Sequence, residues 1–149
     1  TLDGKATTDA GGRTRFGIAE NDHPSVTLIG FYTMPVQQAL GVALVILTRD
    51  YAVPLAIAQI GSQYVANKLL SLGINAGVQR AAEWLQSAVG AIPDGQIGPA
   101  TLAALSRSNS QTILASLKGK AVEFYQQLAA SNPAKYGQYL DGWIRRAEA

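Results

Sequence analysis

The sequence contains no cysteine and one histidine, His23. A chain without cysteine cannot be held by disulfides, and a lone histidine leaves no cluster of the kind that binds zinc. We therefore expect no metal and no cofactor. Charged residues make up only 15% of the 149 residues, whereas hydrophobic residues make up 48%. Such a chain can bury enough apolar surface to offset its ordering entropy, which argues against disorder and for a folded globular domain.

Long hydrophobic runs are absent too. Residues 39–47 are apolar throughout, but a helix that spans a bilayer needs about 20 apolar residues. Gln38 precedes the run and Arg49 closely follows it, so we expect a core helix and no membrane span. The N-terminus has no basic region followed by an apolar run. No signal peptide is therefore predicted in this chain, and any export or anchor segment is expected upstream of Thr1.

The spacing of apolar residues predicts a mainly α fold. From Thr33 onward they recur every three or four positions, which is typical of helices that pack on a core. We predict helices that begin near Pro35, at Pro54, near residue 77, at residue 100, near residue 111 and at Pro133, the second ending or bending at Gly73 and the last reaching Arg146. Ser110 and Asn132 are the expected N-caps of the last two helices.

Residues 1–30 differ from the rest, because they are rich in Gly, Thr and Asp and show no sustained period. They predict an irregular lobe with a short hairpin around residues 13–18. No repeat or long linker divides the chain. We therefore predict one domain over residues 1–149, with about six helices, an N-terminal lobe over residues 1–75 and a helical half over residues 76–149.

A motif of the form D-x-G-G-x-T-x-x-G-I runs from Asp9 to Ile18. Two adjacent glycines between a carboxylate and a hydroxyl let the backbone turn tightly and present the side chains of Asp9 and Thr14 to one cleft. This arrangement is typical of a functional site. Two structural alternatives remain open: Asp9 forms an Asx-turn with the following amides, and Thr14 is a half-buried strand residue.

This motif resembles the N-terminal signature of glycoside hydrolase family 108, the N-acetylmuramidases of phage endolysins and bacterial secretion-associated lysozymes. A second stretch, L-Q at residues 85–86 followed by D-G-x-I-G-P-x-T-L at residues 94–102, looks like the turn of the family's C-terminal peptidoglycan-binding half. The resemblance implies a lysozyme-like fold and hydrolysis of the β-1,4 bond between N-acetylmuramic acid and N-acetylglucosamine. It also implies a catalytic glutamate at or just before position 1, whereas the first glutamate printed here is Glu20.

The resemblance implies that Asp9 is the second catalytic carboxylate and that Thr14 helps to position water or the sugar ring. Glu20 is a further catalytic candidate in the same lobe. To donate a proton near neutral pH it would need burial beside apolar groups such as Phe16 or Phe31, which raises the pKa of a carboxyl group. The alternatives are that Glu20 caps the following turn or stays solvated.

Five residues are candidates for substrate binding: Tyr51, Asn75, Asp94, Gln96 and Thr101. Tyr51 matches a D-Y-W stretch of the family, with Ala52 in place of the tryptophan. Asn75 resembles part of the family's V-N-x-G element and is suited to an N-acetyl group, the alternative being helix capping. Asp94, Gln96 and Thr101 are expected to be exposed on a wall-binding turn, the alternative being a well-capped helix start. Tyr64, Trp84 and Trp143 are expected in the core.

The resulting hypothesis is a monomeric phage endolysin that is made in the infected cell and acts on the periplasmic or extracellular cell wall, with peptidoglycan as its partner. A catalytically silent peptidoglycan-binding module and a structural phage or secretion component are the alternatives. Basic residues in the last third of the chain suit an anionic wall, although they also suit an ordinary solvated surface. These residues are Lys118, Lys120, Lys135, Arg145 and Arg146. No dense basic stripe interleaves with aromatics, so nucleic acid is not an expected partner.

Overall fold

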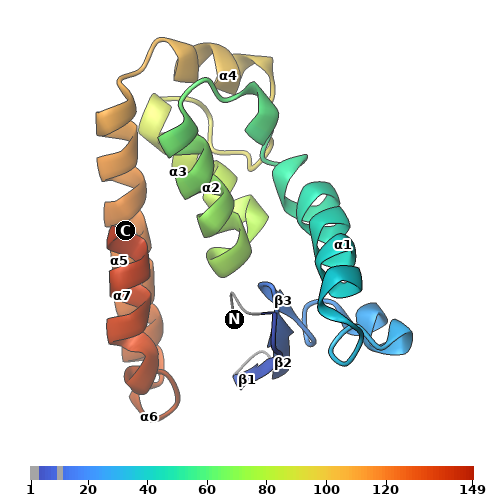
Figure 1. The fold of residues 1–149 in the computed structure, drawn as a ribbon. Coiled ribbons are helices and arrows are strands. Elements are labelled where there is room, and N and C mark those ends of the chain that lie inside the picture. The colour runs from blue at the N-terminus through green and yellow to red at the C-terminus, as the bar shows by residue number, and fades with distance from the viewer. Residues whose placement is uncertain (1–3, 10–11) are drawn as a thin grey trace. The chain divides into compact units, whose positions relative to one another are not determined.

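The computed structural model describes residues 4–9 and 12–149, with Asp9 by its backbone alone. Seven α-helices and a small three-stranded sheet form this described part of the chain (Figure 1), which confirms the predicted mainly α fold. The chain falls into two compact units, Thr1–Asp50 and Tyr51–Ala149. The internal boundary that we expected between residues 75 and 76 lies within the second unit. The reason is that helix α2 (Gln63–Ala76) packs against the helices that follow it.

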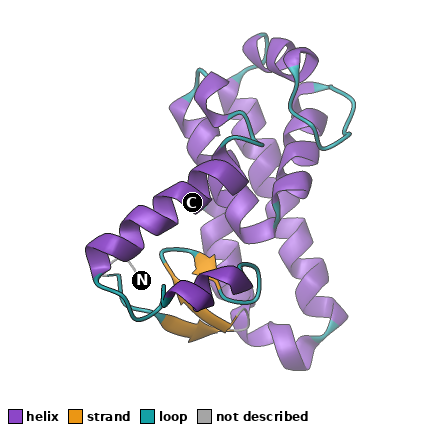
Figure 2. Cartoon of the chain, turned by 90° about the vertical axis from the view of Figure 1, so that its right-hand side faces the viewer, coloured by secondary structure: helices purple, strands orange, loops and turns teal. Residues whose placement is uncertain are grey.

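The first unit begins with an antiparallel sheet in the order β1 (Thr7–Asp9), β2 (Gly12–Arg15), β3 (Ile18–Ala19) (Figure 2). The connection between β2 and β3 places Phe16 and Gly17 at φ of 51° and 79°, the left-handed pair that matches the twist of a two-residue hairpin. This confirms the hairpin predicted around residues 13–18. In its register, Thr14 pairs with Thr7 on β1 and with Ala19 on β3.

A buried arginine holds the first unit together. The Arg15 side chain donates from Nε to the Gly4 carbonyl oxygen (2.5 Å) and from Nη1 to those of Phe31 (2.7 Å) and Met34 (2.8 Å). Buried backbone carbonyls need hydrogen-bond donors. Here a single guanidinium donates to three carbonyl oxygens. Arg15 thereby ties β2 to the segment before β1 and to the turns after the 3-10 helix η1 (Pro24–Ile29).

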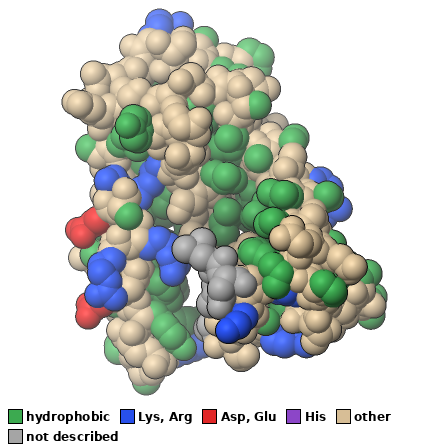
Figure 3. Space-filling view, in the orientation of Figure 1, with side chains coloured by type: hydrophobic (Ala, Val, Ile, Leu, Met, Phe, Trp, Pro, Cys, Tyr) green, Lys and Arg blue, Asp and Glu red, His purple; other side chains and the backbone are tan. Residues whose placement is uncertain are grey.

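Helix α1 (Val36–Leu47) begins near Pro35, as predicted, although Pro35 stands at its N-cap position and not in its first turn, and it continues into the π-helical turn η2 (Thr48–Ala52). Ala39, Ala43 and Ile46 are buried, whereas Leu44 and Val45 are more than half exposed. Hydrophobic side chains are accordingly visible along α1 in Figure 3. Over the described ranges, none of the helices combines the length and hydropathy needed to cross a bilayer.

The second unit is helical. It comprises η3 (Ile57–Gln59), α2, α3 (Val78–Val89), α4 (Pro99–Ser106), α5 (Ser110–Ser131), α6 (Pro133–Tyr136), η4 (Gly137–Tyr139) and α7 (Leu140–Glu148). The long helix α5 packs against α2, α3 and α7. Leu69, Leu85, Leu117 and Ala147, one from each of these four helices, are buried in the same core cluster.

Two predicted limits of α2 are wrong. The helix does not open at Pro54 but after Ser62, whose Oγ accepts a hydrogen bond from the Val65 amide (3.5 Å). Nor does it end at Gly73, which lies inside it. A Cβ on Gly73 would lie 2.6 Å from Cδ1 of the fully buried Leu55. Gly73 therefore permits a close approach between α2 and the segment before it.

Two further predictions about helix ends are corrected. Asn109, not Ser110, caps α5, because its Oδ1 accepts from the amides of Gln111 (2.9 Å) and Thr112 (3.2 Å). Asn132 is a cap as predicted. The single last helix predicted from residue 133 is divided into α6, η4 and α7.

Candidate functional sites

The predicted catalytic residues Asp9 and Thr14 lie on neighbouring strands of the first unit. The backbone of Asp9 ends β1 opposite Gly12, while its side chain lies outside the described residues, as does Gly11 of the motif. Thr14 is half-buried on β2, and its carbonyl oxygen accepts a hydrogen bond from Oγ1 of Thr7 (3.5 Å). The described part of the motif therefore runs from the end of β1 through β2 and the two-residue turn that follows it to Ile18 of β3.

Glu20 follows β3 and pairs with Arg13. Its Oε1 lies 2.6 Å from Arg13 Nη2, and its Oε2 accepts from Arg13 Nε (3.0 Å) and from the Arg13 amide (3.3 Å). Thr27 Oγ1 donates a further hydrogen bond to Oε1 (3.1 Å). The guanidinium fork and the carboxylate thus make two parallel contacts, the geometry of the strongest arginine–carboxylate pairs.

These contacts favour the ionised form of Glu20. The hydrogen bonds from the Arg13 side chain lower the pKa of Glu20 from 4.5 to about 2. A general acid needs the opposite change, a pKa raised toward the working pH. Nor is Glu20 buried as a proton donor would need to be, since its side chain is 28% exposed. This geometry favours a role for Glu20 in holding the hairpin over a role in donating a proton.

A second ionic group lies at the end of the first unit. Asp50 pairs with Arg49 (Oδ1 to Nε, 2.5 Å) and lies 3.8 Å from His23 Nδ1. The hydrogen bonds from Arg49 lower the pKa of Asp50. Tyr51, a predicted substrate-binding residue, comes next and is half-buried in η2. Across the described residues, no cluster of three or more His, Cys, Asp or Glu could hold a metal ion.

The predicted wall-binding turn joins α3 to α4 in the second unit and is built around Gln86. The Nε2 group of this buried glutamine lies within hydrogen-bond distance of Asp94 Oδ1 (2.7 Å), the Gln96 carbonyl (3.0 Å) and Thr101 Oγ1 (3.2 Å). Its Oε1 accepts from the Gly95 amide (2.9 Å). Gln86 belongs to the L-Q part of the motif, but this role was not predicted for it; a polar residue on the core face of a helix is the signal that could have identified it.

Only two of the three residues predicted to be exposed on this turn are exposed. Asp94 and Gln96 are exposed, whereas Thr101 is buried, so the expectation that it is exposed is wrong. Its hydroxyl oxygen lies 3.2 Å from Gln86 Nε2 and so belongs to the buried network. A hydrogen bond from the Gln96 amide (2.9 Å) and one from Gln86 lower the pKa of Asp94. The turn therefore presents an ionised carboxylate and a primary amide to solvent.

Asn75, predicted to contact an N-acetyl group, holds two helices together. Its Nδ2 donates to the Ser71 carbonyl (2.7 Å), and its Oδ1 accepts from Arg146 Nη1 on α7 (2.7 Å). It does not act as a helix cap, since α2 ends at Ala76 and its C-cap residue is Gly77, with φ of 98°. These contacts already use the amide oxygen and one amide donor of Asn75.

The aromatic residues divide between core and surface. Trp143 lies 5.4 Å from the Tyr125 ring and Trp84 lies 5.8 Å from the Phe124 ring, and both tryptophans pack against the core as expected. Tyr64, expected in the core, is 79% exposed. The neighbouring Val65 occupies the core face of α2, so Tyr64 cannot share it.

Comparison with known proteins adds a family match to this geometry. Residues 80–148 match the model of a family described as "Predicted Peptidoglycan domain", a range that lies within the helical half and contains the whole Gln86 network. This match supports a peptidoglycan-associated protein. It does not include the hairpin, so membership of glycoside hydrolase family 108 stays a prediction.

The fold itself is also known from a solved structure. The chain is similar to Brucella abortus SagA with a TM-score of 0.75 and 22% sequence identity, over 98% of this chain and 83% of that chain. At this identity the similarity concerns the fold. A comparison with curated proteins gave no match.

Proposed function

We propose that this protein binds peptidoglycan and hydrolyses the β-1,4 bond between N-acetylmuramic acid and N-acetylglucosamine. The observation that carries the proposal is the match of residues 80–148 to a peptidoglycan domain. The hydrolytic part is supported by the D-x-G-G-x-T motif, whose described residues lie on the paired strands β1 and β2 of the other unit. Binding is therefore assigned to the second unit and cleavage to the first.

The proposed chemistry uses two carboxyl groups. A protonated one gives its proton to the leaving oxygen, and a second one acts as nucleophile or as the base that activates water. We assign the second role to Asp9, with the Thr14 hydroxyl positioning water or the sugar ring. Glu20 is poorly suited to the first role because Arg13 keeps it ionised. The proton donor that fits the proposal is the glutamate that the resemblance implies at or just before position 1.

For wall binding we assign Asp94 and Gln96, whose side chains are exposed on the turn that Gln86 holds. A carboxylate accepts hydrogen bonds from sugar hydroxyls, and a primary amide both donates and accepts them. Tyr51 remains a proposed contact of the sugar. Thr101 and Asn75 are assigned structural roles, since their polar atoms bind within the unit. The biological setting that we propose is a phage endolysin acting on the cell wall of its host.

A catalytically silent peptidoglycan-binding module is the second candidate. It is favoured by one observation, the bidentate pairing of Glu20, the first glutamate of the printed sequence, with Arg13. This candidate predicts that the protein sediments with peptidoglycan and releases nothing from it. A structural phage or secretion component, by contrast, would neither sediment with peptidoglycan nor cleave it.

The deciding experiment incubates purified Gram-negative sacculi with this chain and with a version that carries one added glutamate before Thr1. Sedimentation measures binding, and mass spectrometry of the supernatant identifies released fragments. We expect both versions to sediment and the extended one to release muropeptides with a cleaved β-1,4 bond. In that version, Asp9→Asn should stop release without changing sedimentation.

Asp22→Asn is the matched control, because it makes the same chemical change at an exposed aspartate of the same unit. It should leave fragment release intact. Sedimentation without release from either version would contradict the hydrolase and favour the silent module. Failure to sediment would contradict the proposal as a whole.

A further inference from the structure

A pocket of about 350 Å3 opens between α2, α5 and α7 of the second unit. Among the described residues that line it, the charged side chains are all basic: Lys68 of α2, Lys118 of α5 and Arg146 of α7. Asn67 and Ser71 of α2 add polar groups to its wall. Neither the hairpin motif nor the Gln86 turn contributes to this pocket.

The α2 wall of the pocket is one continuous helical face. Tyr64, Asn67, Lys68 and Ser71 stand at positions i, i+3, i+4 and i+7, which fall on one side of an α-helix. The core residues Val65, Leu69 and Leu72 occupy the other side. Tyr64 remains 79% exposed. The helix thus presents a polar face with an exposed aromatic ring at its first position.

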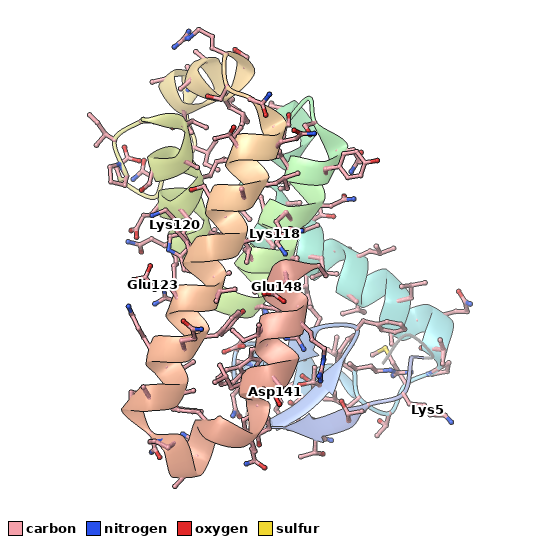
Figure 4. The ribbon with its side chains drawn as sticks, turned by 90° about the vertical axis from the view of Figure 1, so that its left-hand side faces the viewer. Lys5, Lys118, Lys120, Glu123, Asp141 and Glu148 are labelled. Atoms are coloured by element: carbon pink, nitrogen blue, oxygen red, sulfur yellow. The ribbon has the colours of Figure 1, made fainter. Side chains whose placement is uncertain are left out.

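Neutral acceptors hold the three cations in place. Lys68 Nζ donates to the Arg146 carbonyl (3.2 Å), and Lys118 Nζ donates to the Glu148 carbonyl (2.6 Å). Figure 4 shows Lys118 of α5 and Glu148 of α7 close together. Arg146 Nη1 donates to Asn75 Oδ1 (2.7 Å). An ammonium group has three donors and a guanidinium has five, so each cation keeps donors for a ligand.

Within the described part of the chain, no carboxylate forms an ion pair with Lys68, Lys118 or Arg146, although Ala149, the last printed residue, also lines the pocket. Lys68 is 7% exposed. Its burial, and then the charge of Lys118, lower its pKa. Burying one cation beside another without a counter-charge costs free energy, and an anion in the pocket would offset that cost.

We propose that this pocket binds a carboxylate group of a short acidic peptide. The inference rests on the proposed peptidoglycan association for its natural source, the stem peptides of the wall, whose D-glutamate and terminal residues carry free carboxylates. Lys68, Lys118 and Arg146 would bind the carboxylate, and Asn67 with Ser71 would bind the adjoining peptide amides. The volume of about 350 Å3 is at the small end of ligand pockets, which suits one or two residues of a peptide.

The walls favour a peptide over a phosphate polymer. Leu114 and Tyr64 line the same pocket and offer apolar contacts to alanyl methyl groups, for which a phosphodiester backbone has no equivalent. The Asn67 Oδ1 already accepts from Gln63 Nε2 (2.7 Å), which turns its two amide hydrogens toward other acceptors. Peptide carbonyls are acceptors of that kind.

The test titrates the full chain with N-acetyl-L-alanyl-D-glutamate, followed by calorimetry or by NMR shifts of the α2 amides. The diamide of the same dipeptide and inorganic phosphate serve as comparison ligands. The variant is Lys118→Gln, and its matched control is Lys120→Gln. Lys120 lies two residues further along α5 (Figure 4). It lines a different pocket, together with Arg80 and Trp84.

We expect the dipeptide to bind, its diamide and phosphate to bind at least about tenfold more weakly, and Lys118→Gln to weaken dipeptide binding about tenfold. Lys120→Gln should change it less than about twofold, and Lys118→Arg should restore it. Melting curves of each variant establish that α7 is still folded. A loss of binding in Lys118→Gln without loss of folding supports a ligand site over a mere cap on the α7 carbonyls.

Two results would overturn the pocket proposal. One is that the parent chain binds neither the dipeptide nor its diamide, which would leave Lys68 and Lys118 with the helix-capping role alone. The other is that phosphate binds and the dipeptide does not. Sacculus sedimentation with the same samples separates this proposal from the proposed function: intact sedimentation with no dipeptide binding overturns the pocket only, and dipeptide binding without sedimentation overturns the wall association only.

Discussion

Gln86 and Asp94 are joined by a hydrogen bond of 2.7 Å between the glutamine Nε2 and the aspartate Oδ1. The first residue is buried on α3 and the second is exposed on the turn that follows. One side chain of the core therefore determines the conformation of a surface turn. This explains why the glutamine and the D-G-x-I-G-P-x-T stretch form a single pattern although eight positions separate Gln86 from Asp94.

Replacing Gln86 by alanine should lower the free energy of unfolding by about 2 kcal/mol, because buried partners lose their hydrogen bonds. Urea denaturation followed by circular dichroism measures the change. Gln127→Ala is the matched control, since Gln127 is exposed and its Nε2 donates to Glu123 Oε1 on its own helix (3.1 Å). Its effect should stay below about 0.5 kcal/mol. Equal losses in the two variants would show that the network does not stabilise the turn.

Glu20 should titrate with a pKa of about 2. Because this value is below the ordinary 4.5 of an unfolded glutamate, the Arg13 pair stabilises the folded state above pH 4.5, and this contribution is lost as the pH falls from 4.5 toward 2. NMR titration of the Glu20 carboxyl measures the pKa directly. Arg13→Gln should raise it toward 4.5. A midpoint above 6 in the parent protein would contradict the pairing and make Glu20 a suitable proton donor.

Gly73→Ala should destabilise the protein by about 1 kcal/mol, because the new methyl group would meet the fully buried Leu55 side chain at 2.6 Å and overpacking outweighs the gain in helix propensity. Gly119→Ala in α5 is the control, since among the described residues no atom beyond its chain neighbours and its own helix backbone lies within 4 Å of its Cβ position. That change should stabilise by about 0.5 to 1 kcal/mol. If both variants were stabilised in thermal melts, the close contact at Gly73 would be refuted.

Asn109→Ala should cost about 1 kcal/mol, because two amides at the start of α5 lose their side-chain acceptor. Ser110→Ala, at the neighbouring position, should cost less than about 0.5 kcal/mol. Chemical denaturation of the two variants compares them directly. The reverse order would return the cap to Ser110, the residue that the sequence alone suggested.

Sequence periodicity was sufficient for the helices whose core face is continuous. The starts of α1, α3 and α4 agree with prediction, because apolar spacing coincides there with a proline in α1 and α4 and with Gly77 in α3. Periodicity failed to predict helix limits that depend on tertiary contacts. Gly73 looks like a helix end in sequence, but its missing side chain accommodates Leu55, which comes from a segment that local patterns do not connect to it.

In the candidate sites, too, local sequence predicted some features, whereas others depend on side chains distant in the sequence. The hairpin that carries Thr14 followed from local turn chemistry, since Gly17 supplies a positive φ. The environment of Glu20 did not, because its charge depends on Arg13 across the hairpin. Thr101 seemed a surface residue for a similar reason. Its burial follows from the side chain of Gln86, fifteen positions earlier.

The contacts of α7 have a consequence for biosynthesis. Lys68 reaches the carbonyl of Arg146, and Asn75 bonds the side chain of the same arginine, across sequence separations of 78 and 71 residues. Ala147 fills the same core as Val65 and Leu117. On the ribosome, α2 therefore emerges long before the helix that covers it. The nascent chain must keep this apolar surface away from other chains until α7 has left the ribosome, because the second unit completes its core only then.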